Sequence, residues 1–298
     1  MKTSLIITAF KEPQVETAIL AALNQNTNYK YDIIVSAPDK ETEEIIKKYL
    51  KVKLFKDPGK GKSFALNLLF KKIKSDILIL TDGDVFISEN AIEEILKKFK
   101  DEKVGCVTGR PVAINKKTKM IDYFSNLLLD AGAHKIRQLN YKKNKFIECT
   151  GYLFAIRNGI IKENPHLDVA EDSIIPYLIW KKGYWIAYAE KALVYVKYPS
   201  TLKDFIKQRK RAGVGSHSKL DFYYPDFPRV KTFKNEILKG TLWALSYPKN
   251  IKEFFWTLTL FPIRLYIWFI YYFEAKFKKK YYKDGWDRIN STKWIQMK

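Results

Sequence analysis

Two aspartates in the segment Thr81-Asp82-Gly83-Asp84-Val85 are the residues whose types and spacing most clearly suggest chemistry. They follow the apolar run Ile77-Leu78-Ile79-Leu80, which predicts a buried strand that delivers both carboxylates at its carboxyl end. Two carboxylates separated by one Gly can close on Mg²⁺ or Mn²⁺, hard cations that take oxygen ligands and are commonly shared with substrate phosphates. Asp-Gly is also ordinary turn chemistry, so a solvated turn is an equal alternative for these residues alone.

A glycine-rich basic loop with the sequence Asp57-Pro58-Gly59-Lys60-Gly61-Lys62-Ser63 opens a helical pattern. It is not a P-loop, because that motif requires a glycine five residues before Gly61, where Lys56 stands. A loop of this kind at the start of a helix still suits a phosphate or another anion. A plain loop with solvated lysines is an equal alternative.

Two more polar groups follow in the second half of the chain. Glu171-Asp172 precedes the apolar helical run Ile174–Trp180, where a carboxylate can act as a helix N-cap or as a general base that points into a cleft. Gln208-Arg209-Lys210-Arg211 lies in another helical pattern, and its guanidinium groups suit a diphosphate leaving group. A solvated basic face is the alternative for this second group.

The elements that must position these residues alternate regularly in the first 110 residues. Short apolar runs predict strands at Ser4–Phe10, Asp32–Ala37, Val52–Lys56, Ile77–Thr81 and Gly105–Thr108. Amphipathic patterns between them predict helices at Gln14–Asn24, Lys40–Leu50, Ser63–Lys74 and Ala91–Lys100. This alternation implies a parallel sheet with helices on both faces, whose ligands bind outside the carboxyl ends of the strands.

The regular alternation of predicted strands and helices ends after Arg110. The later patterns predict helices at Lys119–Leu139, Ser173–Lys182 and Leu202–Ala212, with strands at Phe146–Ile156, Trp185–Ala189 and Ala192–Tyr198. Beyond Pro225 the composition shifts toward aromatic residues and Lys. We therefore expect one α/β catalytic domain over residues 1–220 and an aromatic, basic C-terminal extension over residues 221–298.

The composition narrows the class of protein further. The chain has 298 residues, of which 47% are hydrophobic, so it can bury a sizeable core and is not disordered over most of its length. Its 54 Lys and Arg against 32 Asp and Glu give a net charge of +22, which predicts anionic partners. Its two cysteines, Cys106 and Cys149, exclude a disulfide framework, and the first apolar run, Leu5–Phe10, is too short for a signal peptide.

The order and spacing of these motifs make the sequence similar to the family 2 inverting glycosyltransferases of the GT-A fold, from about Ser4 to Gly215. The similarity runs through the whole motif order: Phe10-Lys11-Glu12 after the first strand, Asp39 where the family reads the nucleobase, Gly61-Lys62 with Ala65-Leu66-Asn67, Asp82 and Asp84 as the Asp-x-Asp motif, Glu171-Asp172 as the acidic pair, and Gln208 with Arg211 in the Gln-x-x-Arg-Trp motif. Two positions depart from the family pattern. Lys11 stands where Asn is usual, and Ala212 replaces the Trp of processive members, which speaks against a polymerase of the cellulose-synthase type.

The resemblance implies a Rossmann-like, mixed but mostly parallel sheet flanked by helices. It also implies an enzyme that moves a sugar from a nucleotide-diphosphate sugar to a hydroxyl of a lipid-linked or cell-surface glycan, with inversion. In this interpretation Asp172 is the base, with Glu171 as the next candidate, and Asp84 with Asp82 holds Mg²⁺ or Mn²⁺. The residues expected to bind the nucleotide-sugar are Phe10, Glu12, Asp39, Lys62, Asp82, Gln208, Arg209 and Arg211.

The stretch Phe254–Phe273 in the extension is aromatic and aliphatic, and it is long enough to span a bilayer. Its central Arg264 would cost roughly 2.5–3.5 kcal/mol there, and a polar face that includes Glu253, Thr257 and Arg264 favours an amphipathic helix in the interface. The lysines between Lys276 and Lys283 suit an anionic lipid surface at the cytoplasmic face of the cell membrane. A helix packed on the catalytic domain is the first alternative, and a single spanning helix is the second.

Two other functions share some of these features. A nucleic-acid-binding protein would suit the charge and the 15% of aromatic residues, but the base-stacking signatures and basic helix motifs of such proteins are absent, so we expect no nucleic-acid partner. A sugar nucleotidyltransferase would share the carboxylate–metal chemistry. The pairs Glu171-Asp172 and Gln208 with Arg211 favour sugar transfer over that alternative.

Overall fold

The computed structural model describes residues 1–210, 216–230, 232–277 and 290–292. The strands are β1 (Thr3–Thr8), β2 (Tyr31–Ala37), β3 (Val52–Lys56), β4 (Ile77–Asp82), β5 (Phe86–Ile87), β6 (Val104–Ala113), β7 (Leu153–Arg157) and β8 (Trp185–Val196). The helices up to the last strand are α1 (Val15–Leu23), α2 (Lys40–Ile46), α3 (Lys62–Lys72), α4 (Ala91–Lys98), α5 (Met120–Leu127), the π-helix η1 (Leu128–His134), α6 (Lys135–Lys142) and α7 (Glu171–Lys181). The later helices are α8 (Leu202–Lys210), α9 (Ser216–Tyr223), α10 (Phe233–Asn235), η3 (Glu236–Gly240), α11 (Thr241–Leu245), α12 (Ile251–Phe277) and η4 (Asn290–Thr292).

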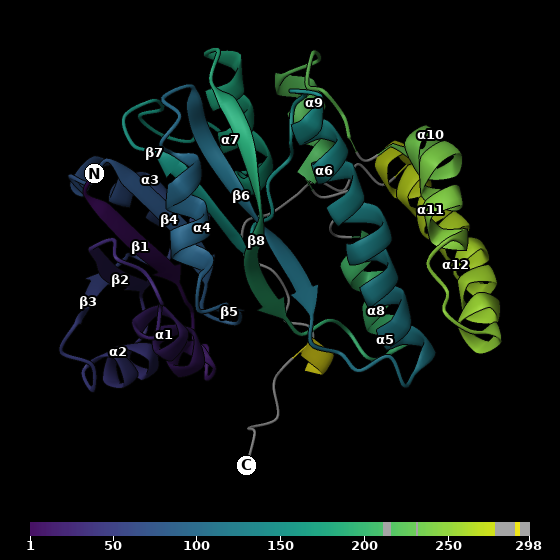
Figure 1. Cartoon of the computed structure of the whole chain (residues 1–298), viewed down its shortest axis with the longest axis horizontal. Helices are drawn as coiled ribbons and strands as arrows, with labels where there is room; N and C mark the ends of the chain where they lie inside the picture. The colour runs from purple at the N-terminus through teal and green to yellow at the C-terminus, as the bar shows by residue number, and fades with distance from the viewer. Residues whose placement is uncertain (211–215, 231, 278–289, 293–298) are drawn as a thin grey trace. The chain divides into compact units, whose positions relative to one another are not determined.

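The strands form one eight-stranded sheet in the order β3-β2-β1-β4-β7-β6-β8-β5 (Figure 1). The first four strands in this order pair in parallel. β7 is antiparallel to both β4 and β6, and β5 is antiparallel to β8. The sheet is therefore mixed, as the resemblance predicts. Four of the five strands that the alternating pattern predicts form its parallel half, whereas the fifth, β6, is separated from them by the antiparallel strand β7.

The centre of the sheet is apolar because both of its faces are covered. Leu5, Ile6 and Ile7 of β1 and Ile77–Ile79 of β4 are fully buried, as expected of parallel strands that helices flank on two sides. The helices show the complementary pattern. In α4, for example, Ile92 and Ile95 are buried, whereas its charged residues lie on the other side of the helix.

Three sequence predictions need correction. The strand predicted at Phe146–Ile156 begins only at Leu153, because residues 146–150 are buried without strand pairing. The two strands predicted at Trp185–Ala189 and Ala192–Tyr198 are one strand, β8, in which Glu190 and Lys191 are simply exposed. The single helix predicted at Lys119–Leu139 is three consecutive helices, α5, η1 and α6, and the middle one is a π-helix.

The chain divides into two compact units. Unit 1 comprises Met1–Pro111, Asn140–Leu167 and Glu171–Val196, and unit 2 comprises Val112–Leu139, Asp168–Ala170 and Lys197–Lys298. The long strand β6 passes from unit 1 into unit 2 after Pro111. This division follows contacts and does not test the predicted functional boundary between residues 220 and 221, which stays a prediction.

Unit 2 is a helical unit in which α12 packs against α5 and α8. One stripe of α12 faces this core: Thr257 is fully buried and bonds the Tyr123 hydroxyl (2.7 Å), Leu260 and Ile267 are buried, and Glu274 pairs with Lys210 (2.7 Å). These four residues are three, seven and seven positions apart, which places them on one side of the helix, so the stripe runs along most of its length. The segment Ile251–Glu274 is long and apolar enough to cross a membrane by length and composition, and 17% of its apolar window is buried.

Candidate functional site

The carboxyl ends of β1, β2 and β4 meet at one edge of the sheet in unit 1. Thr8 at the end of β1 lies opposite Ser36 of β2 and Asp82 of β4, so these strands end together. Ligands of parallel α/β sheets bind at this edge. The sequence therefore delivers Asp82 and the turn that contains Asp84 to the position where a binding site is expected.

Gly83 explains why the two aspartates have a glycine between them. Its backbone N–H donates to the Thr8 carbonyl (2.8 Å), which ties the turn to the end of β1. A Cβ atom at this position would lie 2.9 Å from the Cβ of Ala9, closer than side chains approach. Any larger residue would therefore move Asp82 and Asp84 relative to β1.

Lys62 joins two of the predicted site groups. Its Nζ lies 2.6 Å from Asp82 Oδ1 and 2.6 Å from Glu171 Oε1, so one ammonium bridges the Asp-x-Asp motif and the acidic pair. The helix α3 begins at Lys62, and Gly61 caps it with a positive φ of 98° that favours glycine. Burial lowers the pKa of Lys62, but the Asp82 and Glu171 carboxylates outweigh burial and hold that pKa well above its usual range.

Asp84 has the electrostatics of a cation ligand. Its residue is solvent-accessible, yet desolvation of its carboxyl by the surrounding protein, followed by repulsion from Asp82 and Glu12, raises its pKa from 3.8 to about 7. A divalent cation would relieve this repulsion, so the carboxylates fit Mg²⁺ or Mn²⁺. Among the described residues, no three His, Cys, Asp or Glu side chains are grouped so that they could hold a metal alone. A cation here would need further oxygen ligands, such as the phosphates of a substrate.

The acidic pair forms the first two residues of α7, which begins at Glu171 rather than after the pair. Glu171 is 7% exposed, and its carboxylate forms an ion pair with Lys62. Asp172 is more accessible, and a Cβ atom at Gly151 would lie 3.2 Å from Asp172 Oδ2. Because Gly151 has no side chain, it leaves space beside that carboxylate oxygen. The two acids thus have different surroundings: Glu171 is buried and paired with Lys62, whereas Asp172 is more accessible.

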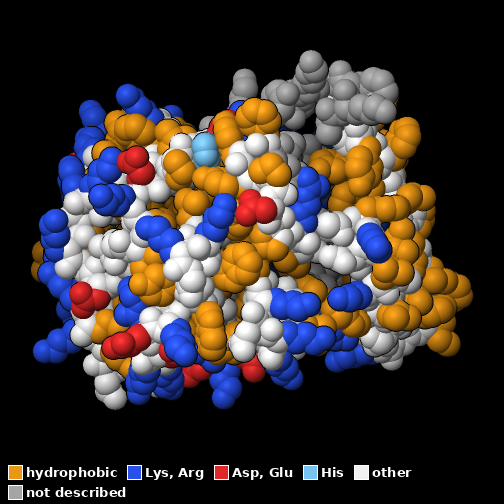
Figure 2. All heavy atoms as spheres, turned by 90° about the horizontal axis from the view of Figure 1, so that it is seen from above, with side chains coloured by type: hydrophobic (Ala, Val, Ile, Leu, Met, Phe, Trp, Pro, Cys, Tyr) orange, Lys and Arg blue, Asp and Glu red, His pale blue; other side chains and the backbone are white. Residues whose placement is uncertain are grey.

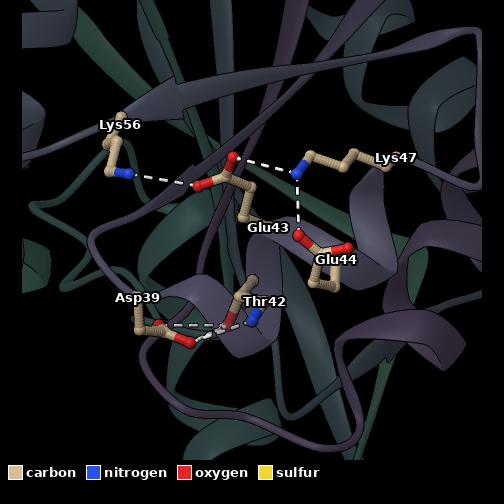
Figure 3. Close-up of polar contacts among 6 residues, drawn as sticks. All are labelled: Asp39, Thr42, Glu43, Glu44, Lys47 and Lys56. Carbon is tan, nitrogen blue, oxygen red and sulfur yellow. Dashed lines mark hydrogen bonds and ion pairs between the residues drawn. The ribbon is translucent and has the colours of Figure 1, made fainter.

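Asp39 and the Phe10-Lys11-Glu12 segment form another group at the same edge of the sheet. Asp39 caps α2 by accepting from the Thr42 backbone N–H (2.9 Å; Figure 3). Its other oxygen accepts from the Lys11 N–H (2.9 Å). Burial raises the pKa of Asp39, but the hydrogen bonds to its carboxylate lower that pKa by more than burial raises it. The pKa of Asp39 therefore lies below its usual value. Lys11 has a positive φ of 46°, unusual for a residue with a side chain, and Phe10 is 59% exposed.

Figure 3 also shows the exposed ion pairs of α2, in which Glu43 lies between Lys56 (3.1 Å) and Lys47 (3.3 Å). Exposed pairs of this kind contribute little to stability. One of them, Glu43–Lys56, links α2 to the end of β3, while Asp39 caps the start of the same helix. Asp39 therefore has a structural role that is independent of any ligand.

The remaining predicted residues belong to unit 2 or lie outside the described residues. Gln208 is 7% exposed, and its Oε1 accepts no hydrogen bond from the part of the chain that the structure describes. The Arg209 guanidinium lies 5.5 Å from the ring centres of both Tyr198 and Phe205. Arg211, Ala212 and residues 278–289 lie outside the described residues.

Sequence reasoning missed two contributors to the site. The Thr8 hydroxyl donates to Asp82 Oδ1 (3.0 Å), and Gly151 provides the space beside Asp172. Thr8 sits at the last position of a buried strand, which is a usable signal for a residue at this sheet edge. Gly151 carries no such signal, because its role depends on a helix that follows it by 20 residues.

Comparison with known proteins gives the chain a family context. Residues 2–215 match the sequence pattern of the family described as Glycosyltransferase like family 2. The "Probable glycosyltransferase YdaM" of Bacillus subtilis (strain 168) is 28% identical over 77% of this chain and 59% of its own length. The hyaluronan synthase of Streptococcus pyogenes is 26% identical over 51% of this chain and 39% of its own length. The chain thus spans between about two fifths and three fifths of these relatives.

A solved structure shares the fold. A mannosyltransferase from Pyrobaculum calidifontis, in complex with GDP-Man and Mn²⁺, superposes with a TM-score of 0.61 at 15% sequence identity, covering 93% of this chain and 88% of that one. The likeness extends over both units, and it confirms the predicted GT-A class of fold.

Proposed function

Because this chain belongs to the glycosyltransferase-like family 2, we propose that it transfers a sugar from a nucleotide-diphosphate sugar to an acceptor hydroxyl, with inversion at the anomeric carbon. The observation that carries the proposal is the convergence of Asp82, Lys62 and Glu171 in one ion-paired group. Asp84 lies two residues after Asp82, and Asp172 follows Glu171 directly in α7. The GDP-Man and Mn²⁺ bound to the structural neighbour support a nucleotide-sugar donor and a divalent cation.

The donor would bind along the sheet edge. Phe10, Glu12 and Asp39 lie after β1 and β2 and would contact the nucleoside, while Lys62 would place its ammonium on the diphosphate. Gln208, Arg209 and Arg211 keep the diphosphate-binding role that the motif predicts.

Asp84, together with Asp82, would hold Mg²⁺ or Mn²⁺. Such a cation supplies Lewis-acid stabilisation of the leaving diphosphate. The charge that the chain itself adds is the Lys62 ammonium, which is held near these carboxylates by two contacts of 2.6 Å. An ammonium with a raised pKa stays protonated throughout the physiological pH range, so it can stabilise a developing negative charge.

Asp172 would act as the general base. Its Oδ2 would accept the proton of the acceptor hydroxyl, which attacks the anomeric carbon from the face opposite the diphosphate in a single displacement. Glu171 is less suited to this role, because its carboxylate is buried and paired with Lys62. A single displacement requires no covalent intermediate on the enzyme.

The acceptor is proposed to be a lipid-linked or cell-surface glycan, with the enzyme held at the cytoplasmic face of the cell membrane. The outward side of α12 carries large apolar residues that are 40–67% exposed: Phe254, Phe255, Leu258, Leu265, Tyr266, Phe269, Tyr272 and Phe273. A second row on η3 and α11 adds Ile237, Leu238, Leu242 and Leu245. Hydrophobic side chains gather along this side of the molecule in the space-filling view (Figure 2). Apolar patches of this extent mark membrane or protein contacts.

The packing of α12 favours an interfacial helix over a spanning one. Arg264 forms a two-pronged ion pair with Glu236 (2.6 and 2.7 Å), and Trp268 Nε1–H donates to the same carboxylate (2.8 Å). Together with the hydrogen bond between Thr257 and Tyr123, these contacts hold one side of α12 against the rest of unit 2. A spanning helix would lose all of them, whereas a helix that lies in the membrane plane keeps them and buries only its outward side.

Nucleotide binding tests the proposal without knowledge of the acceptor. We expect isothermal titration to show that UDP or GDP binds in the presence of Mn²⁺ and loses affinity in EDTA or in the Asp84→Asn variant. Asp32→Asn is the matched control, because Asp32 pairs with Lys53 (3.0 Å) at the opposite, amino end of β2. Binding that neither EDTA nor Asp84→Asn changes would contradict the metal site, and no binding of any nucleotide would contradict the proposed function.

A further inference from the structure

A pocket of about 360 Å³ lies in unit 1, where the ends of α4, α6 and α7 meet the starts of β6 and β8. Three aromatic residues line it: Tyr141, Trp180 and Trp185. Four lysines also line it, among them Lys100 and Lys145. None of these residues belongs to the proposed donor, metal or base groups.

The pocket is distinct from the proposed active site, because it lies at the opposite edge of the sheet. β6 is antiparallel to β7, as is β4, so β6 and β4 run in the same direction. Val104, which lines the pocket, is the first residue of β6, whereas Asp82 is the last residue of β4. The helix α7 gives the same result: Glu171 and Trp180 lie at its two ends, about 14 Å apart by helical rise.

The tryptophans are the most unusual feature of the pocket. The chain has seven Trp residues, and only Trp180 and Trp185 precede residue 243. Both line this one pocket, and they are 38% and 43% exposed. Phe146 packs its ring against Trp180 (centroids 5.6 Å apart), and Lys103 lies over Trp185 (5.5 Å). These contacts fix the two indoles and leave apolar ring surface open to a ligand.

The charge of the pocket is positive. Lys98 lies over the Tyr141 ring (4.9 Å) and donates to its hydroxyl (3.3 Å), while Lys100 and Lys145 are exposed at the rim. Asp101 is the one acidic residue among the lining residues, and one of its oxygens already accepts the Lys103 backbone N–H (2.9 Å). A ligand with carboxylate or phosphate groups would therefore be favoured over a neutral one.

We propose that this pocket binds one or two residues of an anionic saccharide chain. Indole faces pack against the apolar faces of sugar rings, and the lysines would pair with the acidic groups of the chain. The volume is at the small end of the range for ligand pockets, about 300–1,000 Å³. A nucleic-acid strand would need a basic groove with stacking rings placed one after another, whereas these rings converge on one pocket. The proposal rests on the proposed function, since an enzyme that acts on a glycan would hold the chain away from its reacting end.

Fluorine NMR of the full-length protein labelled with 5-fluorotryptophan tests this proposal. The signals of Trp180 and Trp185 are assigned from the variants Trp180→Phe and Trp185→Phe. We expect both signals to shift with a galacturonic acid hexasaccharide and to shift more weakly with cellohexaose, its neutral counterpart. Saturation by inorganic phosphate alone, or a stronger response to an oligothymidylate, would overturn the saccharide assignment.

Charge reversal at the rim gives the quantitative test. The double variant Lys100→Glu/Lys145→Glu should weaken binding of the acidic hexasaccharide about tenfold, as two exposed ion pairs would, and leave cellohexaose binding unchanged. Lys51→Glu/Lys191→Glu changes the net charge equally at exposed lysines outside the pocket and should have no such effect. Equal weakening by both double variants, or no shift of the two tryptophan signals, would overturn the proposal. Donor turnover is measured on the same protein to separate this proposal from the proposed function. If the pocket does not bind the saccharide but the protein still turns over its donor, only the pocket proposal fails.

Discussion

At the scale of single residues, the position of Lys62 says most about the site. Its ammonium is the cation that holds Asp82 and Glu171 together, and a divalent cation would use one of the same carboxylates. Lys62 and a metal ion therefore compete for Asp82, while the phosphates of a donor would offer Lys62 another partner. This arrangement favours binding of metal and donor together over binding of metal alone.

The variant Lys62→Met tests this competition. Without divalent cation it should be less stable than the natural protein by about 1–3 kcal/mol, because two partly buried carboxylates lose their partner. Added Mn²⁺ should restore more stability to this variant than to the natural protein, as measured by thermal unfolding with and without the metal. The control is Lys60→Met in the same loop, where Lys60 lies over the Phe64 ring and contacts neither carboxylate. Equal Mn²⁺ effects on the variant, the control and the natural protein would contradict the competition.

Asp84 predicts a dependence of stability on pH. Folding raises the pKa of this carboxyl from 3.8 to about 7, so the folded protein binds the proton more tightly than the unfolded chain. The stability that comes from the neutral carboxyl is complete below about pH 4 and is lost as the pH rises to about 7. We expect thermal unfolding to show a smaller loss of stability over this range in Asp84→Asn than in the natural protein. We also expect the stabilisation by Mn²⁺ to grow between about pH 5.5 and 7.5, because a carboxyl must lose its proton before it can bind a metal ion. A pH profile that the substitution leaves unchanged would refute this assignment.

We expect substitutions of the two acids at the start of α7 to have different effects. Asp172→Asn keeps the shape and removes the base, so kcat should fall by roughly 10²–10⁴ with little change in donor affinity. Glu171→Gln should instead disturb the Lys62 contact and weaken donor binding. Measurement of kcat and donor affinity for both variants distinguishes the roles. The assignments would have to be exchanged if Glu171→Gln abolished turnover and Asp172→Asn did not.

At the scale of elements, the helix α12 is the part of the fold that we propose to contact the membrane. Its inward stripe is part of the unit 2 core, so removal of the helix would also remove Leu260 and Ile267 from that core. Point variants on the outward side are therefore the cleaner test. Phe255→Ser/Phe269→Ser changes two residues that are 61% and 67% exposed. This variant should keep its melting temperature and lose sedimentation with vesicles that contain anionic lipid.

Controls on the same helix separate surface from core. Thr257→Val removes the hydrogen bond to Tyr123 inside unit 2 and should lower stability while vesicle binding persists. High salt should release part of the natural protein from the vesicles, since a basic interface is screened. Protein that resists both salt and alkaline carbonate and requires detergent for release would indicate a spanning helix instead.

The elements also show what a sequence can predict. The strands β1 and β4 and the helix α4 were predictable, because apolar runs and 3.6-residue periodicity report burial directly. The segment 146–152 was not, because burial without strand pairing produces the same apolar run as a strand does. The same holds for the candidate site. The motif order singled out Asp82, Asp84 and Asp172 as candidates, but no local pattern could show that one lysine bridges Asp82 and Glu171. Such contacts depend on how segments distant in sequence meet in the fold.

At the scale of the whole molecule, the positive charge and the exposed apolar surface both suit an anionic lipid surface. The net charge is +22, and in Figure 2 Lys and Arg side chains outnumber the acidic ones over the visible face. An anionic lipid surface attracts such a protein over about a Debye length, roughly 8 Å at physiological salt, and the outward side of α12 then supplies the apolar contact. The anionic donor and the proposed acidic glycan are drawn by the same field.

Turnover of a donor panel tests the central claim, that this chain is a metal-assisted nucleotide-sugar transferase, most directly. The natural protein and Asp172→Asn are incubated with UDP-, GDP- and dTDP-linked sugars, in Mn²⁺ and in EDTA, and the nucleoside products are identified by mass spectrometry. We predict that the natural protein releases the nucleoside diphosphate from at least one donor in Mn²⁺, that EDTA stops the release, and that Asp172→Asn binds that donor but does not turn it over. Release of a nucleoside monophosphate, or turnover that survives both EDTA and Asp172→Asn, would contradict the account.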